Sequence, residues 1–261
     1  MPDMMGRTVE EQQKNSTFIP GVIDRKVGRQ QKNQHMKSMR LSYWIASFLR
    51  DKMAIDKKRV ISTIVEAASN YEKFLNNRNF LIVYKSEKTN EYVEVVFRSW
   101  HFLHLTGLKT KLTAIQFYEA CIDNKLSEKD LILENNGKVR QKIQVLPYLH
   151  DLLYHNCMIG NFINSGIMIQ ADYFVGDTKL ILSVGFRREL DRDVPVTLYS
   201  GDIRKLTNPT HRVLAIFVRR YPDTVYKDTT YVAKNVDLAE LELPEEVVLS
   251  SAVDGNNNSD N

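Results

Sequence analysis

Between residues 57 and 97 the spacing of apolar side chains changes from every third or fourth residue to every second residue. After Asp56, the apolar residues from Ile61 to Leu75 recur at helical spacing and would form one face of a helix. Residues 76–79, three of them asparagine, end that pattern. Residues 80–84 and 92–97 then alternate as strands do, and the polar stretch between them predicts a hairpin. The chain therefore changes from helix to paired strands within forty or so residues, about the size of one supersecondary unit.

The remaining patterns extend this order. A helix is also predicted from Leu41, a capping box at Thr113–Gln116 starts a helix that ends near Asn124, and residues 143–154 have helical spacing around Pro147. Two strands are predicted within residues 167–186, joined by a turn at Gly176–Asp177. Further strands are predicted over residues 194–199, 213–218 and 226–232. Helices followed mainly by strands in hairpins predict the α+β class.

Charge and composition divide the chain into four parts. Residues 1–60 carry 13 Lys and Arg against 6 Asp and Glu, whereas residues 236–261 carry seven acids and no Lys or Arg. We expect residues 1–37 to be a disordered basic segment and residues 236–261 a disordered acidic tail, because neither has sustained apolar periodicity. Between them we expect a helical segment over residues 38–78 and an α+β domain over residues 79–235.

Several classes of protein are excluded by what the sequence lacks. No apolar run approaches the roughly 18 residues of a membrane-spanning helix, so the expected location is the cytoplasm. Cys121 and Cys157 lack metal-ligand spacing, and no phosphate-binding loop, nucleophile elbow or dinucleotide fingerprint occurs. The sequence therefore predicts no metal and no cofactor. The net charge of +4 permits a polyanionic partner such as RNA.

The polar groups most suggestive of chemistry follow the strand at residues 92–97. This strand leads into His101, His104, Thr106 and Gly107, and polar side chains at the end of a rigid element are a frequent location of active sites. Cleavage of RNA without a metal needs one group to remove a proton from the 2′-hydroxyl and another to protonate the leaving oxygen. Histidine suits both transfers because its pKa lies near neutrality. The alternative is that these histidines are structural.

Three short sequences resemble a known family. Phe97–Gly107 ending in Phe-Leu-His-Leu-Thr-Gly, the helix with Phe-Tyr-Glu at residues 117–119, and Leu-Ser-Val-Gly-Phe at residues 182–186 are similar to the phage-associated members of the barnase, EndoU, colicin and RelE-like nuclease superfamily. The resemblance covers roughly residues 78–233. It implies N-terminal helices followed by a curved, mainly antiparallel β-sheet with inserted helices, whose concave face holds RNA.

The resemblance and the chemistry together give a set of candidate residues. The resemblance places His104 and Thr106 in the catalytic motif, an arginine after the Gly-Phe strand end and a serine at position 200, and His211 is the candidate for the second proton-transfer group. The expected catalytic residues are His104, Thr106, Arg187, Ser200 and His211. The expected nucleic-acid-binding residues are Lys57, Lys58, Arg59, Lys109, Lys111 and Arg188. Neighbouring residues on a strand face opposite ways, so at most one of Arg187 and Arg188 should enter a given cleft.

Two functional hypotheses remain open at this stage. The first is a metal-independent endoribonuclease, a toxin-like RNA-cleaving protein of mobile-element origin, with a possible inhibitor or element-encoded protein partner. The second is a non-catalytic module on the same fold that binds nucleic acid or a protein. Clustering of His104, Thr106 and one arginine around a cleft favours the first hypothesis, and burial of His104 among apolar side chains favours the second.

Overall fold

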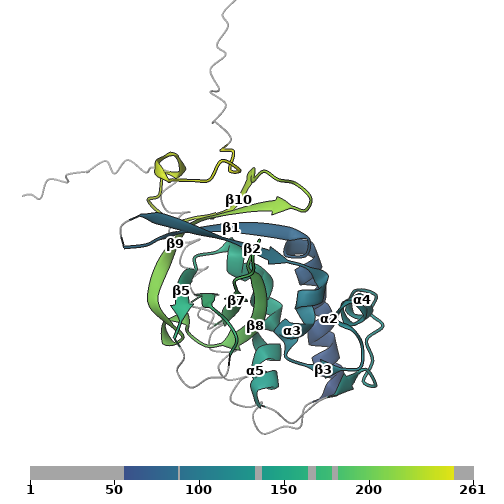
Figure 1. The fold of residues 1–261 in the computed structure, drawn as a ribbon. Helices are drawn as coiled ribbons and strands as arrows, with labels where there is room; N and C mark the ends of the chain where they lie inside the picture. Colours follow the sequence, from purple (N-terminus) through teal and green to yellow (C-terminus); the bar gives the residue numbers. More distant parts are fainter. Residues whose placement is uncertain (1–55, 88, 133–136, 164–168, 178–181, 250–261) are drawn as a thin grey trace, which may run out of the picture. The chain divides into compact units, whose positions relative to one another are not determined.

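The computed structural model of the chain describes residues 56–87, 89–132, 137–163, 169–177 and 182–249 (Figure 1). The expected helix from Leu41, the expected basic segment 1–37 and residues 250–261 lie outside the described residues. The described part combines helices with a curled antiparallel sheet, so the predicted α+β class is confirmed.

The first helix, α2, spans Lys57–Phe74 as its periodicity predicts. The Asp56 side chain caps it by accepting a hydrogen bond from the backbone N–H of Lys58 at 3.0 Å. Its buried face includes Ala68 and Tyr71, whose ring packs edge-on against Phe97 and Phe102. The helix thereby joins the same core as the strands that follow it.

The other helices are short. The predicted capping box is present, because Thr113 and Gln116 each bond the other's backbone N–H at the start of α4 (Ala114–Ile122). Further helical turns are η1 (Ser99–His101), α3 (Phe102–Thr106), α5 (Gly137–Val145), η2 (Leu146–Tyr154), η3 (Ile203–Lys205) and η4 (Leu238–Glu240). Pro147 lies in the first turn of η2, where its missing N–H costs least. Among the described residues, no helix is long and apolar enough to cross a membrane.

The main sheet is antiparallel and follows the order β2-β1-β9-β5-β6-β7-β8, with β10 also paired to β9. Its strands are β1 (Arg78–Lys85), β2 (Asn90–Phe97), β5 (Met158–Phe162), β6 (Tyr173–Asp177), β7 (Leu182–Arg187), β8 (Val194–Ser200), β9 (Thr207–Arg220) and β10 (Asp228–Val232). A small second pair joins β3 (Lys109–Thr110) to β4 (Leu131–Ile132). The hairpins β1–β2 and β6–β7 and the later strands are confirmed.

Two details of the sheet differ from the sequence-based expectation. Gly176 and Asp177 belong to β6 and pair with β7, so they do not form the turn between these strands. Strand β5 was not predicted, because Gly160 and Asn161 are both unfavourable in strands. Pairing with β6 on one side and β9 on the other stabilises it nevertheless.

The sheet curls until its two ends approach each other. Asp193, just before β8, accepts a hydrogen bond from the N–H of Val96 at 2.9 Å and donates one to the carbonyl of Glu94 at 3.0 Å. These bonds connect β2 to the segment that leads into β8. The inner face of the curled sheet therefore packs into one large core with α2, α3 and α4.

The C-terminal residues correct one expectation. The tail from residue 236 was predicted to be disordered, but Leu238, Leu241, Leu243 and Val247 pack on the outer face of β1 and β9 against a cluster that includes Phe217. Backbone hydrogen bonds of Tyr226 with Glu246 and Val248 hold this segment in place. The sequence predicted disorder because acidic residues interrupt the apolar ones in this segment. The apolar residues are buried only by contact with the folded sheet.

Candidate active site

The inner face of the curled sheet changes from apolar to polar at one end. On β1 the core residues Phe80 and Ile82 are followed two positions later by Tyr84, and on β7 Val184 and Phe186 are followed by Arg188. The same alternation continues outward from the core on the other strands. The polar residues that it places on the inner side are Tyr84, Glu91, Asn161, Tyr173, Arg188 and His211.

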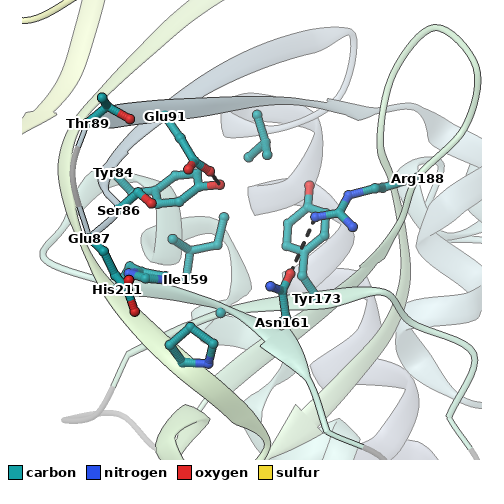
Figure 2. A pocket seen from close by; sticks show the side chains of 13 residues that line it. Tyr84, Ser86, Glu87, Thr89, Glu91, Ile159, Asn161, Tyr173, Arg188 and His211 are labelled. Atoms are coloured by element: carbon teal, nitrogen blue, oxygen red, sulfur yellow. Dashed lines mark hydrogen bonds between the residues drawn. The ribbon is translucent and has the colours of Figure 1, made fainter.

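These residues meet because the strands are antiparallel. At one end of the sheet, the last residues of β1, β5 and β7 lie beside the first residues of β2, β6 and β9. There the polar groups line a pocket of about 510 Å³, within the size range of sites for small ligands. Ile159, Gly160 and Pro209 supply apolar wall, and Ser86, Glu87 and Thr89 come from the β1–β2 hairpin. Figure 2 shows Tyr84, Glu91 and His211 on one side of the pocket and Arg188, Tyr173 and Asn161 on the other.

A carboxylate, a phenol and an imidazole lie together on the first side. The Tyr84 hydroxyl donates to Glu91 Oε2 at 2.7 Å, and the rings of Tyr84 and His211 are 5.7 Å apart. Hydrogen bonds from Tyr84 and then Ser86, with the nearby His211 charge, lower the pKa of Glu91. Burial, followed by the bond to Glu91, raises the pKa of Tyr84 to about 12. At neutral pH Glu91 is therefore an ionised acceptor and Tyr84 a protonated donor.

The second side of the pocket presents a guanidinium. The Arg188 Cζ atom lies 5.4 Å from the centre of the Tyr173 ring, and its Nη2 donates to Asn161 Oδ1 over a long 3.4 Å. The backbone N–H of Arg188 donates to the Asp172 carboxylate at 2.7 Å. The Tyr173 hydroxyl donates to Asp193 at 2.7 Å, so the ring beneath Arg188 is fixed in orientation. The guanidinium can thus hydrogen-bond an anion in the pocket.

Of the residues predicted from the sequence, Arg188 and His211 line this pocket. His104 is exposed on α3 and is absent from the lining. Arg187 points away as alternation requires and pairs with Glu189 at 2.5 Å. Ser200 pairs with Leu182 at the other end of β7 and β8. The lysines at 109 and 111, and Lys57, Lys58 and Arg59 in the first turn of α2, are exposed and also lie outside the lining.

The His-Leu-Thr-Gly motif ends a helix. Thr106 is fully buried, where its hydroxyl donates to the Leu103 carbonyl at 2.7 Å and accepts from the Leu108 N–H at 3.1 Å. Gly107 follows with φ +68° as the left-handed cap of α3, and the stem of Lys142 packs where a side chain would project from it. Both hydrogen bonds of the Thr106 hydroxyl are therefore internal and hold the end of α3, and the catalytic role expected for Thr106 stays a prediction.

The sequence analysis missed Tyr84, Glu91, Asn161 and Tyr173. Glu91 and Tyr84 could have been found from the alternation of side chains along their strands. Each is a polar residue that lies two positions from an apolar residue facing the inside of the sheet. Asn161 and Tyr173 offered less, because β5 was not recognised and β6 begins at Tyr173. Among the described residues, no three His, Cys, Asp or Glu side chains form a cluster able to hold a metal ion.

The fold and the pocket define a class of protein: an α+β protein whose curled antiparallel sheet presents carboxylate, imidazole and guanidinium groups at one end. The family model described as phage-Barnase-EndoU-ColicinE5/D-RelE like nuclease 4 (PBECR4) matches residues 63–235, well over half of the chain. The protein belongs to this nuclease family, which confirms the resemblance noted in its sequence. No curated protein and no solved structure matches the chain.

Proposed function

We propose that the protein is an endoribonuclease that cleaves RNA without a metal, by attack of the ribose 2′-hydroxyl on the neighbouring phosphate. The observation that carries this proposal is the convergence of Glu91, His211 and Arg188 on one pocket. The pocket thus combines an ionised carboxylate, an imidazole that can donate a proton and a fixed cation, as acid–base catalysis at a phosphodiester requires.

Each group has a distinct role in the proposed reaction. Glu91 accepts the proton of the 2′-hydroxyl as its oxygen forms a bond to phosphorus, and the imidazolium of His211 protonates the 5′-oxygen as the P–O5′ bond breaks. Arg188 stabilises the charge that builds up on the phosphorane oxygens. The products are a 2′,3′-cyclic phosphate and a 5′-hydroxyl. Tyr84 contributes by holding the Glu91 carboxylate in place.

The proposal is tested by comparing two pocket variants with a matched histidine variant outside the pocket. Glu91→Gln and His211→Ala should each lower kcat/KM by roughly two to four powers of ten, the usual loss for a proton-transfer group. His104→Ala should retain activity, because His104 does not line the pocket. Activity should survive EDTA, and a substrate with a single 2′-deoxy sugar at the cleavage position should remain intact.

Different results would point elsewhere. A large loss in His104→Ala with none in His211→Ala would return the catalytic role to the motif of α3. A requirement for a divalent metal would contradict the mechanism. If purified protein binds RNA but cleaves none, the non-catalytic binding module is the correct alternative.

For the biological role, we propose a toxin-like RNA-cleaving protein of mobile-element origin that acts in the bacterial cytoplasm and is restrained by an inhibitor protein. The phage-related family supports this role. Expression of the chain in bacteria should arrest growth, and Glu91→Gln should relieve the arrest at equal protein level. Equal arrest by both forms would contradict a role that depends on cleavage.

A further inference from the structure

A second group of cations lies on the outer face of the sheet, beside the seam where β2 meets the segment before β8. It consists of Arg98, Arg192 and Arg219, which we call the arginine cluster. Arg192 and Arg219 share the Glu94 carboxylate: Arg219 Nη2 donates to its Oε1 at 2.8 Å and Arg192 Nε lies 3.8 Å from the same atom. The cluster therefore holds more positive than negative charge.

Arg98 adds a charge that is paired directly with no carboxylate in the part of the chain that the structure describes. Its residue is only 8% exposed, and its guanidinium donates to the carbonyls of Arg78 and Phe97 and to Asn79 Oδ1. Burial, and then the charges of Arg192 and Arg219 among others, lower the pKa of Arg98, which reflects how closely these cations are placed. Keeping like charges together costs free energy, which an anion bound there would offset.

Arg219 has unused hydrogen-bonding capacity. Its side chain is 9% exposed, and its Nε atom is buried and has no hydrogen-bond partner among the described residues. A buried donor left unsatisfied is unusual. This donor adds to the excess of positive charge in the cluster.

An aromatic side chain stands directly over the cluster. The Arg98 Cζ atom lies 5.1 Å from the centre of the Tyr221 ring, yet Tyr221 remains 59% exposed. An exposed ring supported by a guanidinium is the kind of platform on which an unpaired base stacks. Phosphate-binding cations and a stacking ring are thus next to each other.

The arginine cluster is connected to the pocket by one short loop. Arg188 lines the pocket, and Arg192 lies four residues further along the same loop, so their Cα atoms are at most about 14 Å apart. The backbone of Asp193 fixes the end of this loop to β2 through Glu94 and Val96. Arg98 and Tyr221 follow the ends of β2 and β9 that lie away from the pocket, so Arg192 stands between the pocket and the stacking ring. Glu91 and Arg98 are seven residues apart, about 23 Å along a strand, which an RNA strand of several nucleotides would span.

We propose that the arginine cluster and Tyr221 form a second binding site for single-stranded RNA, which holds the substrate beyond the phosphate being cleaved. A phosphate is bound at the exposed Arg192, next to the charges of Arg98 and Arg219, and a base is stacked on Tyr221. This inference rests on the proposed function for the identity of the substrate. It does not rest on the chemistry in the pocket.

The test uses the full chain and two substrates, a dinucleotide and an oligonucleotide of about ten nucleotides, within the range that single-strand sites cover. Tyr221→Ala should raise KM for the longer substrate by about five- to a hundredfold, as expected for loss of one stacked base, with kcat unchanged. KM for the dinucleotide should not change. Tyr221→Phe keeps the ring and should behave as the wild type.

Binding is measured separately on a 2′-deoxy version of the longer oligonucleotide, which cannot be cleaved by 2′-attack. Arg192→Gln should weaken this binding and reduce the slope of log K against log salt by about one. Arg204→Gln is the matched control, since Arg204 is exposed on η3 and already paired with Asp202.

The outcomes separate this inference from the proposed function. Weakened binding in Tyr221→Ala and Arg192→Gln supports the second site even if no RNA is cleaved, in which case the proposed function alone fails. Equal effects on the dinucleotide and the longer substrate, or binding unchanged in both variants, would overturn the second site.

Discussion

At the scale of single residues, the pocket depends on hydrogen bonds that fix ionisation states. The bond from the Tyr84 hydroxyl is the first cause of the lowered pKa of Glu91, and Tyr84 itself stays protonated because its pKa is raised to about 12. Tyr84 therefore acts on the reaction through Glu91 and is a positioning residue.

Tyr84→Phe should move the acidic limb of the pH–rate profile to higher pH. Without the phenol, the pKa of Glu91 rises, so the base becomes protonated at a pH where the wild-type carboxylate is still ionised. The measurement is kcat/KM against pH. Tyr92→Phe is the control, because Tyr92 follows Glu91 on β2, is 51% exposed and does not line the pocket. An unchanged acidic limb would show that Glu91 is not the base.

His101 gives a second prediction at this scale, on stability. Burial, and then the Arg98 charge, lower its pKa from 6.5 to about 4, so the unfolded chain binds more protons than the folded one between these values. The free energy of unfolding should rise between pH 4 and 6.5, by up to about 3 kcal/mol, and this contribution should level off above pH 6.5.

Denaturant unfolding at several pH values measures the His101 effect. His101→Gln should be less stable at neutral pH, because the Arg98 N–H loses its bond to His101 Nδ1, but its stability should fall less between pH 6.5 and 4. A pH dependence identical to the wild type in this range would assign the effect to other groups.

At the level of helices and strands, the strands supply the residues of the pocket and the helix ends have a structural role. The inner rows of the strands supply the pocket, whereas the His-Leu-Thr-Gly stretch terminates α3 and turns the chain toward β3. The glycine is required twice, by its positive φ and by the Lys142 stem that occupies the space beside it.

Gly107→Ala should destabilise the fold by roughly 1–2 kcal/mol from backbone strain alone, and more from contact with Lys142. Gly137→Ala is the matched control, because an added Cβ there meets nothing within 4 Å and alanine favours helix. Thermal unfolding of both variants measures the difference. Equal melting temperatures would contradict the role assigned to Gly107.

At the scale of the whole described region, the sheet is covered on both faces. The large inner core joins the sheet to the helices, and residues 238–247 cover part of its outer face with leucine and valine side chains. The acidic C-terminal stretch is therefore part of the fold as far as it is described.

Truncation tests this arrangement. A chain ending at residue 249 should melt at nearly the wild-type temperature, because residues 250–261 have no apolar pattern. A chain ending at residue 236 should melt several degrees lower, since it exposes the outer cluster around Leu81 and Phe217. Identical melting of both truncated chains would show that the segment adds no stability.

Much of the local structure could be predicted from the sequence, because it follows from short-range rules. The helix after Asp56, the capping box at Thr113 and the strands other than β5 follow from periodicity and capping. The opposite directions of Arg187 and Arg188 also follow from the alternation of side chains along a strand. Which of the two arginines lines a pocket does not follow, because that depends on which face of the sheet is concave.

The class of fold, the family and the elements with strong periodicity can be predicted from the sequence without the structure. The position of the site depends on the tertiary structure. Glu91 and His211 are far apart in the chain, and they come together because β2 and β9 lie on either side of β1 in one curled sheet. The tertiary structure also decided that Gly160 and Asn161 lie in a strand and that the C-terminal leucines are buried against the sheet. Short-range rules cannot give these results, because burial and strand pairing depend on contacts between distant residues.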